Sequence, residues 1–286
     1  MTISFVKMQG IGNDFIVIDC RDKAVSRQVS AISKLSRRLC DRRFGIGADQ
    51  ILLLHNSDRA DFRMSIYNAD GSEVEMCGNG IRCFAKYIWD RNLSSKKVLD
   101  IETPAGIIRP EKAGDMVRVD MGVPVLEGRQ IPVRLPAHPS LGKGGQGGVI
   151  GFPLKILDKR FKITCVSMGN PHAVIFVEDV ARVDVANYGP LIENHKLFPK
   201  RINVEFIEVV NARTLKMRVW ERGSGETLAC GTGACAAAVA SNLSGRTGKK
   251  VKVRLPGGDL FIELDRNSHI YMTGPAVEVF EGLMNI

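Results

Sequence analysis

An internal repeat constrains the fold of this chain more than any other feature of the sequence. Residues 73–80 read Glu-Val-Glu-Met-Cys-Gly-Asn-Gly, and 153 residues later residues 226–233 read Glu-Thr-Leu-Ala-Cys-Gly-Thr-Gly. Upstream, Gly12-Asn13 matches Gly169-Asn170 at an offset of 157. A long-period repeat within one chain predicts two similar halves. We therefore expect one cysteine site in each half, and expect the two cysteines to face one cleft.

Each repeated cysteine precedes a segment with the pattern of a helix. Apolar residues recur at helical spacing after Cys77, which predicts a helix that begins near Gly78. Residues 234–243, after Cys230, predict a second helix that is apolar on nearly every face and therefore buried. The first turn of a helix presents free N–H groups, which lower the pKa of a neighbouring thiol and can bind a carboxylate. Both cysteines are candidates for proton transfer beside an anion site.

The other cysteines have a simpler interpretation as small core residues. We expect this role for Cys20, Cys40 and Cys165. Four cysteines could instead hold a metal, but Cys83 follows Cys77 by six residues and Cys235 follows Cys230 by five. On a helix these spacings turn the second cysteine away from the first, so we expect Cys83 and Cys235 in the core and no metal site. Seven cysteines at irregular spacing also argue against a secreted disulfide framework.

Composition excludes several other classes of protein. The chain has 286 residues, 44% of them apolar, as in ordinary globular proteins. It shows no targeting signal and no apolar run of membrane-spanning length, so we expect a cytoplasmic protein with no membrane partner. The net charge of +9 is scattered without a nucleic-acid motif, so we expect no nucleic-acid partner. The glycine cluster at residues 143–148 lacks a Gly-Lys-Ser/Thr ending, and we interpret it as a mobile loop rather than a phosphate site.

Many short strands and few helices predict an α+β fold. A helix is expected at residues 29–43, and the clearest strands are expected at residues 15–19, 51–54, 62–68, 161–167, 173–177, 204–210 and 215–221. A Pro- and Gly-rich connection at residues 123–152 separates the halves.

Three polar residues of the second half lie where the repeat predicts a site. His172 follows Asn170 in a turn equivalent to that of Asn13, although a solvent-exposed loop histidine is an equal alternative. Glu221 takes the place of Asn68, and Arg222 follows it. A surface ion pair is the simpler interpretation of these two charges, but polar strand ends that lead into a cysteine loop favour a site.

Taken together, the motifs resemble the diaminopimelate epimerase family over nearly the whole chain. The most specific are Met-Cys-Gly-Asn-Gly-Ile-Arg at residues 76–82, Gly-Asn-Pro-His at 169–172 and Ala-Cys-Gly-Thr-Gly-Ala at 229–234. The resemblance implies two pseudo-symmetric, mixed β-barrel-like halves, each around a central helix. Residues 1–123, joined by a C-terminal strand at 274–286, would form one half, and residues 124–273 the other.

The family resemblance also implies an activity and the residues that perform it. Members interconvert LL- and meso-diaminopimelate without a cofactor, in the biosynthesis of lysine and peptidoglycan precursors. Cys77 and Cys230 would be the catalytic acid and base, and His172 and Glu221 would modulate the pKa of the thiols. Substrate would be bound by Asn13, Gln50, Asn68, Gly78, Asn79, Asn170, Asn203, Glu221, Arg222, Gly231 and Thr232. A homodimer is expected, with Phe280 where the family often carries a tyrosine at its dimer contact.

Two alternatives to this activity differ in class. Proline and hydroxyproline racemases pair two cysteines in the same fold, but they resemble Met-Cys-Gly-His-Gly, so Asn79 favours the epimerase. A thiol-rich metal-binding protein would instead bind stoichiometric zinc when reduced.

Overall fold

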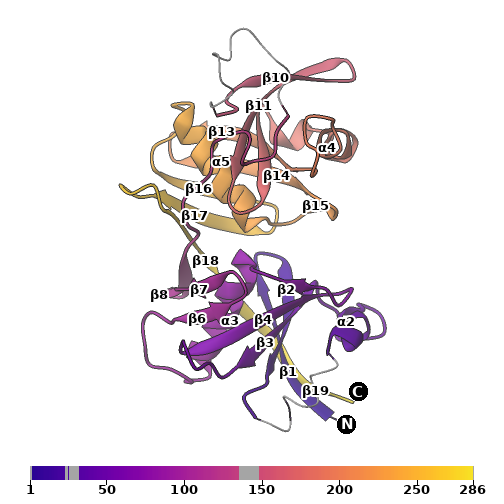
Figure 1. Cartoon of the computed structure of the whole chain (residues 1–286), viewed down its shortest axis with the longest axis vertical. Helices are drawn as coiled ribbons and strands as arrows, with labels where there is room; N and C mark the ends of the chain where they lie inside the picture. The colour runs from indigo at the N-terminus through magenta and orange to yellow at the C-terminus, as the bar shows by residue number, and fades with distance from the viewer. Residues whose placement is uncertain (1, 23–24, 26–31, 135–147, 286) are drawn as a thin grey trace. The chain divides into compact units, whose positions relative to one another are not determined.

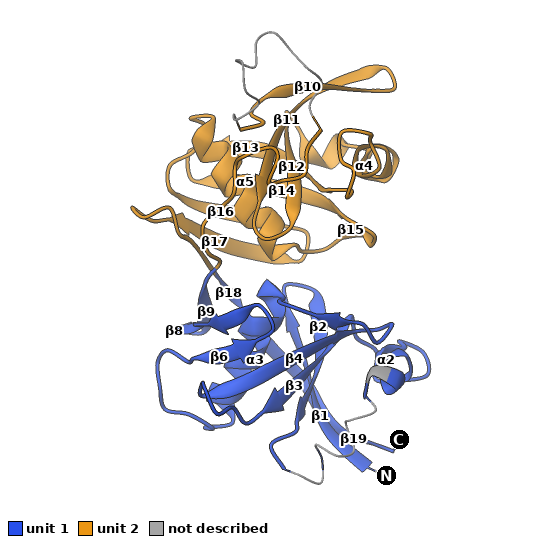
Figure 2. Ribbon diagram, viewed as in Figure 1, with its two compact units in different colours: residues 1–120, 273–286 blue, residues 121–272 orange. Residues whose placement is uncertain are grey.

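The computed structural model describes residues 2–22, 25, 32–134 and 148–285. The expected mobile loop at residues 143–148 lies outside the described residues except for Gly148, and so does the start of the helix expected at residues 29–43. The chain forms the elements labelled in Figure 1 and divides into two compact units, coloured in Figure 2. The first unit comprises Met1–Asp120 and Thr273–Ile286, and the second comprises Met121–Met272.

A mixed sheet forms the body of the first unit, in the strand order β19-β1-β2-β3-β4-β6-β7 with β5 paired to β4. Its strands are β1 (Thr2–Gly10), β2 (Asn13–Asp19), β3 (Gln50–His55), β4 (Phe62–Asn68), β5 (Glu73–Val74), β6 (Ile101–Thr103), β7 (Gly106–Ile108) and β19 (Val277–Asn285). Strands β2 and β3 are parallel, whereas β3 and β4 are antiparallel. A short antiparallel pair follows, β8 (Glu111–Ala113) with β9 (Met116–Asp120).

The sheet of the second unit follows the equivalent order β10-β11-β12-β13-β14-β16-β17, with β15 paired to β14. Its strands are β10 (Phe152–Ile156), β11 (Lys159–Ser167), β12 (Pro171–Val177), β13 (Asn203–Asn211), β14 (Thr214–Glu221), β15 (Gly225–Thr227), β16 (Lys250–Leu255) and β17 (Gly258–Leu264). Strand β18 (Ile270–Pro275) carries the chain from the second unit back into the first.

The sequence repeat is therefore a structural repeat. An offset of 153 maps helix α3 (Gly78–Asp90) onto helix α5 (Gly231–Leu243), and an offset of 157 maps β1 onto β11. The parallel pairing of β2 with β3 recurs between β12 and β13, and that of β4 with β6 recurs between β14 and β16. The predictions of an α+β fold and of two similar halves are confirmed.

One helix lies at the centre of each unit. Helix α3 packs against β1, β2, β3 and β19, and helix α5 packs against β11, β12, β13, β16 and β17 (Figure 1). The alanines of α5 from Ala234 to Ala240 are fully buried. Small side chains on all faces allow a sheet to approach the helix from several sides, which agrees with the prediction of a buried helix.

Two other helices differ from the expectation. Helix α2 (Ile32–Cys40) ends before Arg43, because the Asp41 carboxylate accepts hydrogen bonds from the amides of Arg43 and Phe44, each at 2.7 Å, and turns the chain. Helix α4 (Val185–Glu193) was not expected, since Gly189 and Pro190 weaken its pattern. No helix within the described residues is both long and apolar enough to cross a membrane.

Candidate active site

Cys77 occupies the N-cap position of helix α3 in the first unit. Its backbone is extended (φ −138°, ψ 117°), and its Sγ accepts a hydrogen bond from the Gly80 amide at 3.4 Å. The thiol lies 3.8 Å from Asn13 Oδ1, and Asn79 Nδ2 donates to the same oxygen at 3.3 Å. The helix therefore begins where the repeat predicted, with Cys77 at its end and Asn13 beside it.

Polar side chains gather at the strand ends next to this thiol. Asn13 begins β2, Gln50 begins β3 and Asn68 ends β4, and the pairing of these strands brings the three ends to one edge of the sheet. Gln50 Nε2 donates to Asn68 Oδ1 at 2.9 Å. Two buried acceptors, Gln50 Oε1 and Asn79 Oδ1, have no hydrogen-bond partner among the described residues. Such atoms can accept hydrogen bonds from a ligand's ammonium group.

A charged network that the sequence analysis missed holds Asn13 in place. Asn13 Nδ2 donates to Asp49 Oδ2 at 2.7 Å, and Arg42 bridges Asp49 and Asp14, with 2.8 Å to each. The ammonium group of Lys7, which is buried, lies 2.7 Å from Asp14. Burial alone would raise the pKa of Asp14, but hydrogen bonds and charge from Arg42 and Lys7 lower it to about 2.

Cys230 occupies the equivalent N-cap position on helix α5, with an extended backbone (φ −128°, ψ 110°). It is only 4% exposed, and its Sγ lies 3.5 Å from Thr232 Oγ1. Burial and then the charges of Glu221 and Glu205 raise the pKa of the Cys230 thiol well above its ordinary value. Thr232 and the Gly233 amide oppose this shift, although that amide makes no capping hydrogen bond. The expected lowering by the helix end is therefore wrong for Cys230, because burial and two carboxylates outweigh it.

The remaining candidates of the second unit also lie at strand ends. Asn170 Nδ2 donates to Thr232 Oγ1 at 3.3 Å, which ties the turn before β12 to the start of α5. Asn203 begins β13, and its Oδ1 accepts from the Arg222 amide at 2.9 Å. Gly231 is the first residue of α5, as Gly78 is of α3.

Glu221 and Arg222 do not form the surface ion pair that was the simpler interpretation, as judged from the described residues. The Glu221 carboxylate accepts from Thr227 Oγ1 at 2.6 Å. The exposed Arg222 guanidinium donates to the Lys200 carbonyl at 3.2 Å. Arg222 therefore keeps most of its donors for a ligand or solvent.

His172 is fully buried, so the solvent-exposed alternative is wrong. Its Nδ1 lies 2.7 Å from Glu205 Oε1, and its Nε2 lies 2.9 Å from Asn170 Oδ1. Sequence reasoning missed Glu205, which is also fully buried, because residues 204–210 were interpreted only as a strand. A glutamate between Val204 and Phe206 in an otherwise apolar strand was the available signal.

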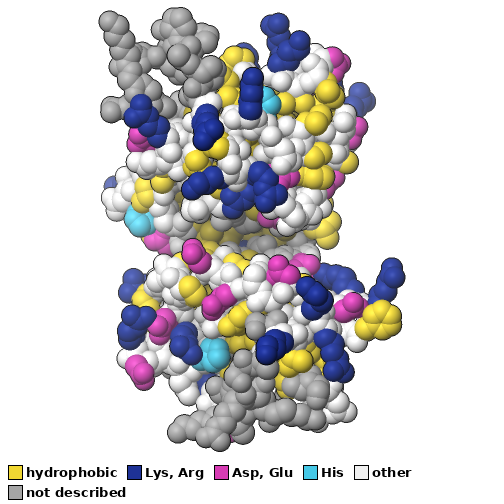
Figure 3. Space-filling model, turned by 45° about the vertical axis from the view of Figure 1, so that its right-hand side comes forward, with side chains coloured by type: hydrophobic (Ala, Val, Ile, Leu, Met, Phe, Trp, Pro, Cys, Tyr) yellow, Lys and Arg dark blue, Asp and Glu magenta, His cyan; other side chains and the backbone are white. Residues whose placement is uncertain are grey.

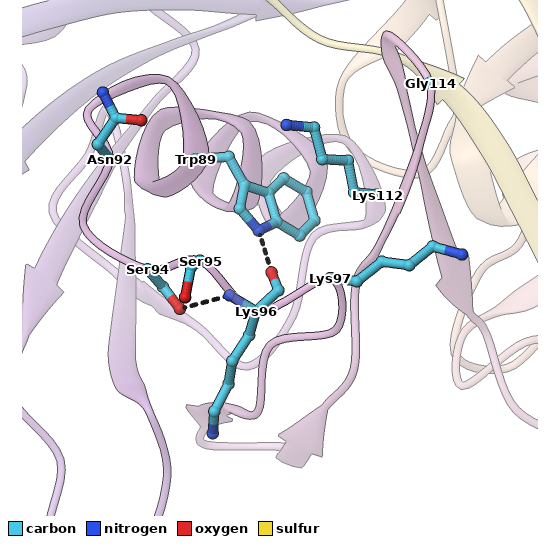
Figure 4. Close-up of a pocket in the computed structure, with 8 residues that line it drawn as sticks. All are labelled: Trp89, Asn92, Ser94, Ser95, Lys96, Lys97, Lys112 and Gly114. Carbon is cyan, nitrogen blue, oxygen red and sulfur yellow. Dashed lines mark hydrogen bonds between the residues drawn. The ribbon is translucent and has the colours of Figure 1, made fainter.

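Other features lie apart from these two sites. Cys83 and Cys235 are fully buried, and Cys20, Cys40 and Cys165 are also buried, as expected for core residues. Phe280 is 47% exposed on β19 and packs edge-to-face on Phe5. A surface pocket of the first unit, shown in Figure 4, is lined by Trp89, three lysines and neighbouring residues and contains none of the candidates. On the face seen in Figure 3, lysines and arginines are interspersed with acidic and neutral side chains.

Comparison with known proteins identifies the family. The family model of diaminopimelate epimerase matches residues 5–127 and 164–279. The chain belongs to the diaminopimelate epimerase family. It is 52% identical to the diaminopimelate epimerase of Moorella thermoacetica, covering 97% of this chain and 98% of that one. It is 47% identical to that of Methanococcus maripaludis, covering 99% of this chain and all of that protein.

Solved structures at lower identity share the fold of this family member. A phenazine biosynthesis protein of the PhzF family from Bacillus anthracis aligns over 100% of both chains with a TM-score of 0.71 and 17% identity. A hydroxyproline epimerase from Agrobacterium vitis aligns over 99% of this chain and 91% of that chain, with a TM-score of 0.68 and 14% identity. At this identity the likeness concerns the fold.

Proposed function

We propose that this chain interconverts LL- and meso-diaminopimelate by acid/base chemistry of two cysteines, without a cofactor, as a step of lysine and peptidoglycan precursor biosynthesis. One observation carries the proposal: each half of this member of the diaminopimelate epimerase family has a thiol at the N-cap of its central helix. Inversion at carbon needs a base on one face and an acid on the other.

In the proposed mechanism, one thiol is deprotonated and the other protonated when substrate binds. Cys77 removes the α-hydrogen of the LL isomer, and Cys230 delivers a proton to the opposite face; the roles exchange for the meso isomer. The raised pKa of Cys230 supports the first step, because it keeps that thiol protonated as the acid. The two thiols act as a pair, so in each direction of the reaction one is a thiolate and the other is protonated.

The helix N-termini supply electrostatic stabilisation. We propose that Gly78 and Asn79 on α3, and Gly231 and Thr232 on α5, bind the α-carboxylate through their free amides. A carboxylate held by hydrogen-bond donors accepts charge from the adjacent carbanion as the hydrogen leaves. This arrangement supports carbanion chemistry by the chain's own groups.

Selectivity for the substrate rests on its distal end. The second carboxylate would bind Arg222, whose guanidinium donates to the Lys200 carbonyl and, within the described part of the chain, retains further donors for a ligand. The distal and reacting ammonium groups of the substrate would be held by protein side chains. These are the carboxamides of Asn13, Gln50, Asn68, Asn170 and Asn203 and the carboxylate of Glu221. Amino acids with one carboxylate should therefore be poor substrates.

We further propose a homodimer in the cytoplasm. The exposed apolar side chains of β19, Val277, Val279, Phe280 and Leu283, support a contact between copies at this strand. A reducing compartment suits a reaction that needs two free thiols.

The test is turnover of LL-diaminopimelate in deuterated water. The parent enzyme should place solvent deuterium in the product before it appears in recovered substrate, because separate groups remove and return the proton. Cys77→Ala and Cys230→Ala should bind the ligand without inverting it. Cys83→Ala, a matched substitution of a core cysteine on α3, should retain turnover. Epimerisation by either of the first two variants would contradict the two-thiol mechanism.

A further inference from the structure

The two halves differ at one pair of buried positions beside their thiols. In the first half, a Cβ added to Gly80 would lie 3.3 Å from Leu52 and 3.4 Å from Phe15, so an apolar pair packs against the first turn of α3. The repeat offsets place Glu205 and His172 at these positions in the second half. A Cβ added to Gly233 would lie 2.8 Å from Glu205 Oε1. The start of α5 therefore packs against a carboxyl group where the start of α3 packs against hydrocarbon.

A continuous set of polar contacts joins Glu205 to the catalytic thiol. Glu205 Oε1 lies 2.7 Å from His172 Nδ1, and His172 Nε2 lies 2.9 Å from Asn170 Oδ1. Asn170 Nδ2 then donates to Thr232 Oγ1 at 3.3 Å, and this hydroxyl lies 3.5 Å from Cys230 Sγ. The first two members are fully buried, and Glu205 Oε2 has no hydrogen-bond partner among the described residues.

The directions of these hydrogen bonds determine where the protons of His172 and Glu205 lie. Asn170 donates through Nδ2 to Thr232, so its Oδ1 faces His172 and requires a proton on Nε2. His172 Nδ1 then either accepts from a protonated Glu205 or donates to an ionised one. In both cases the two side chains together hold two protons and carry no net charge. An uncompensated charge at this depth would be costly, and this arrangement avoids it.

We propose that Glu205 is a positioning residue for the Cys230 half of the reaction, acting through His172 to fix Asn170 and Thr232 against the Cys230 thiol. The role rests on the proposed function, since it concerns the step in which Cys230 gains or gives a proton. At the matching positions of the first half, Leu52 and Phe15 stand in place of Glu205 and His172. The two faces of the substrate therefore meet thiols that are held by different means.

The charged and titratable groups near Glu205 and His172 come from the neighbouring strands and from the start of helix α5. Glu221 faces it from β14, Cys165 from β11 and Cys230 from the start of α5. Burial raises the pKa of Glu205, which agrees with a proton retained between Glu205 and His172. Loss of that proton would leave a negative charge beside Cys230 and disfavour its thiolate.

Nitrogen NMR of the five histidine rings tests the proton positions without turnover. The His172 signals are assigned by their loss in His172→Phe. The parent should show a proton fixed on Nε2 at neutral pH. Glu205→Gln should keep it, because the amide N–H can donate to Nδ1 as a carboxylic acid does. Glu205→Leu should lose the fixed tautomer. A parent spectrum with the proton on Nδ1 and a bare Nε2 would overturn the proposal.

Isotope effects in the two directions then test the role in catalysis. Substrates carry deuterium at the reacting carbon, and kcat/KM is compared with that of the protium form. In Glu205→Leu the Cys230 step should slow by roughly tenfold to a hundredfold. The isotope effect should then rise for the meso isomer, where Cys230 removes the hydrogen, and fall for the LL isomer, where Cys77 does. A general loss of structure would not shift the two directions oppositely.

Two further variants complete the design. Glu205→Gln should retain kcat within roughly threefold, because it preserves the hydrogen bond to His172. Glu208→Gln alters a glutamate on the same strand that pairs with Lys216 at 2.7 Å, and it should leave both isotope effects unchanged. Unchanged isotope effects in Glu205→Leu, or failure of Glu205→Gln to retain turnover, would overturn the positioning role. Absence of turnover in the parent would instead refute the proposed function.

Discussion

Cys77 and Cys230 occupy equivalent helix ends but lie in different surroundings. Cys77 has Asn13 and the apolar side chains of Phe15 and Leu52 nearby, whereas Cys230 is buried beside Glu221 and Glu205. Their positions could be predicted from the repeat, because a Cys-Gly-x-Gly before a helical pattern indicates an N-cap. The partners of Cys230 could not, since they come from strands β13 and β14 that only the folded sheet brings to the helix end.

The charge of Glu221 can be tested at Cys230. After burial, the charge of Glu221 contributes most to raising the pKa of this thiol. Glu221→Gln removes the charge but preserves the shape, so the pKa of Cys230 should fall and the thiol should react at lower pH than in the parent. Alkylation of Cys230 with iodoacetamide, followed across pH by mass spectrometry of its peptide, measures the change. Glu226→Gln, on the adjoining β15 but paired with Arg218 at 2.7 Å, should leave the profile unchanged. An unshifted profile in Glu221→Gln would refute this electrostatic role.

Asp14 should give the protein an acid-dependent part of its stability. Its pKa is about 2 when folded, below the ordinary value of 3.8. A lowered pKa means that the stabilisation is present above the unfolded value and is lost as pH falls through the folded value. Asp14→Asn should therefore lower the free energy of unfolding by roughly 2 kcal/mol or more at neutral pH.

Urea unfolding of parent and variant at several pH values measures this difference. The difference in free energy of unfolding between the parent and Asp14→Asn should narrow as pH falls from 3.8 to about 2. Asp58→Asn is the control, since Asp58 is an exposed carboxylate that forms no part of the network of Lys7 and Arg42 around Asp14. If this difference stays constant with pH, the charge of Asp14 is not the source of the lost stability.

Among the helices and strands, those with a regular apolar pattern could be predicted from the sequence, whereas helix α4, which depends on a tertiary contact, could not. Helices α3 and α5 begin and end at equivalent repeat positions, and the long strands follow the apolar runs of the sequence. Helix α4 was missed because its glycine is a packing residue: a Cβ on Gly189 would lie 2.5 Å from Trp220 Cγ. Its available start signal was Asp184, whose side chain accepts from the Asn187 amide.

The close approach of α4 to β14 predicts the effect of a methyl group. Gly189→Ala should destabilise the protein by roughly 1–3 kcal/mol, because Trp220 is packed against the helix and must shift. Thermal unfolding measures the loss. Asn187→Ala, an exposed substitution on the same helix, should change stability much less. If Gly189→Ala is as stable as the parent, helix α4 and Trp220 can move apart at little cost, and the close contact does not limit stability.

The pair that distinguishes the two halves can also be exchanged. The double variant His172→Phe/Glu205→Leu reproduces the apolar pair of Phe15 and Leu52 beside α5. Replacing a buried polar pair by hydrocarbon of similar size often stabilises a protein by roughly 1–4 kcal/mol. We expect the double variant to unfold at a higher temperature and to lose epimerase activity. A less stable variant would indicate that the second sheet cannot accept the packing of the first.

At the scale of the whole molecule, the proposed reaction makes a demand that neither unit meets alone. Each unit contributes one thiol, and both must act on one carbon. If the two thiols share a carbon as proposed, we expect them to reach disulfide distance when no substrate separates them. Mild oxidation should therefore join Cys77 to Cys230 and abolish turnover, and a thiol reductant should restore it. Peptide mapping by mass spectrometry identifies the link. Bound substrate should slow its formation, and finding only other linkages would contradict a shared site.

The return of the chain to its first unit affects the order in which the protein can fold during synthesis. Strand β1 pairs along its length with β19, from Thr2 opposite Asn285 to Gln9 opposite Val277. On the ribosome, the second unit is contiguous and can close as soon as it emerges. The first unit meanwhile has an apolar edge strand whose partner has not yet been made. An unpaired edge of this kind is a site for wrong pairing with other chains. The half synthesised first is thus the half completed last, and its edge strand waits longest for its partner.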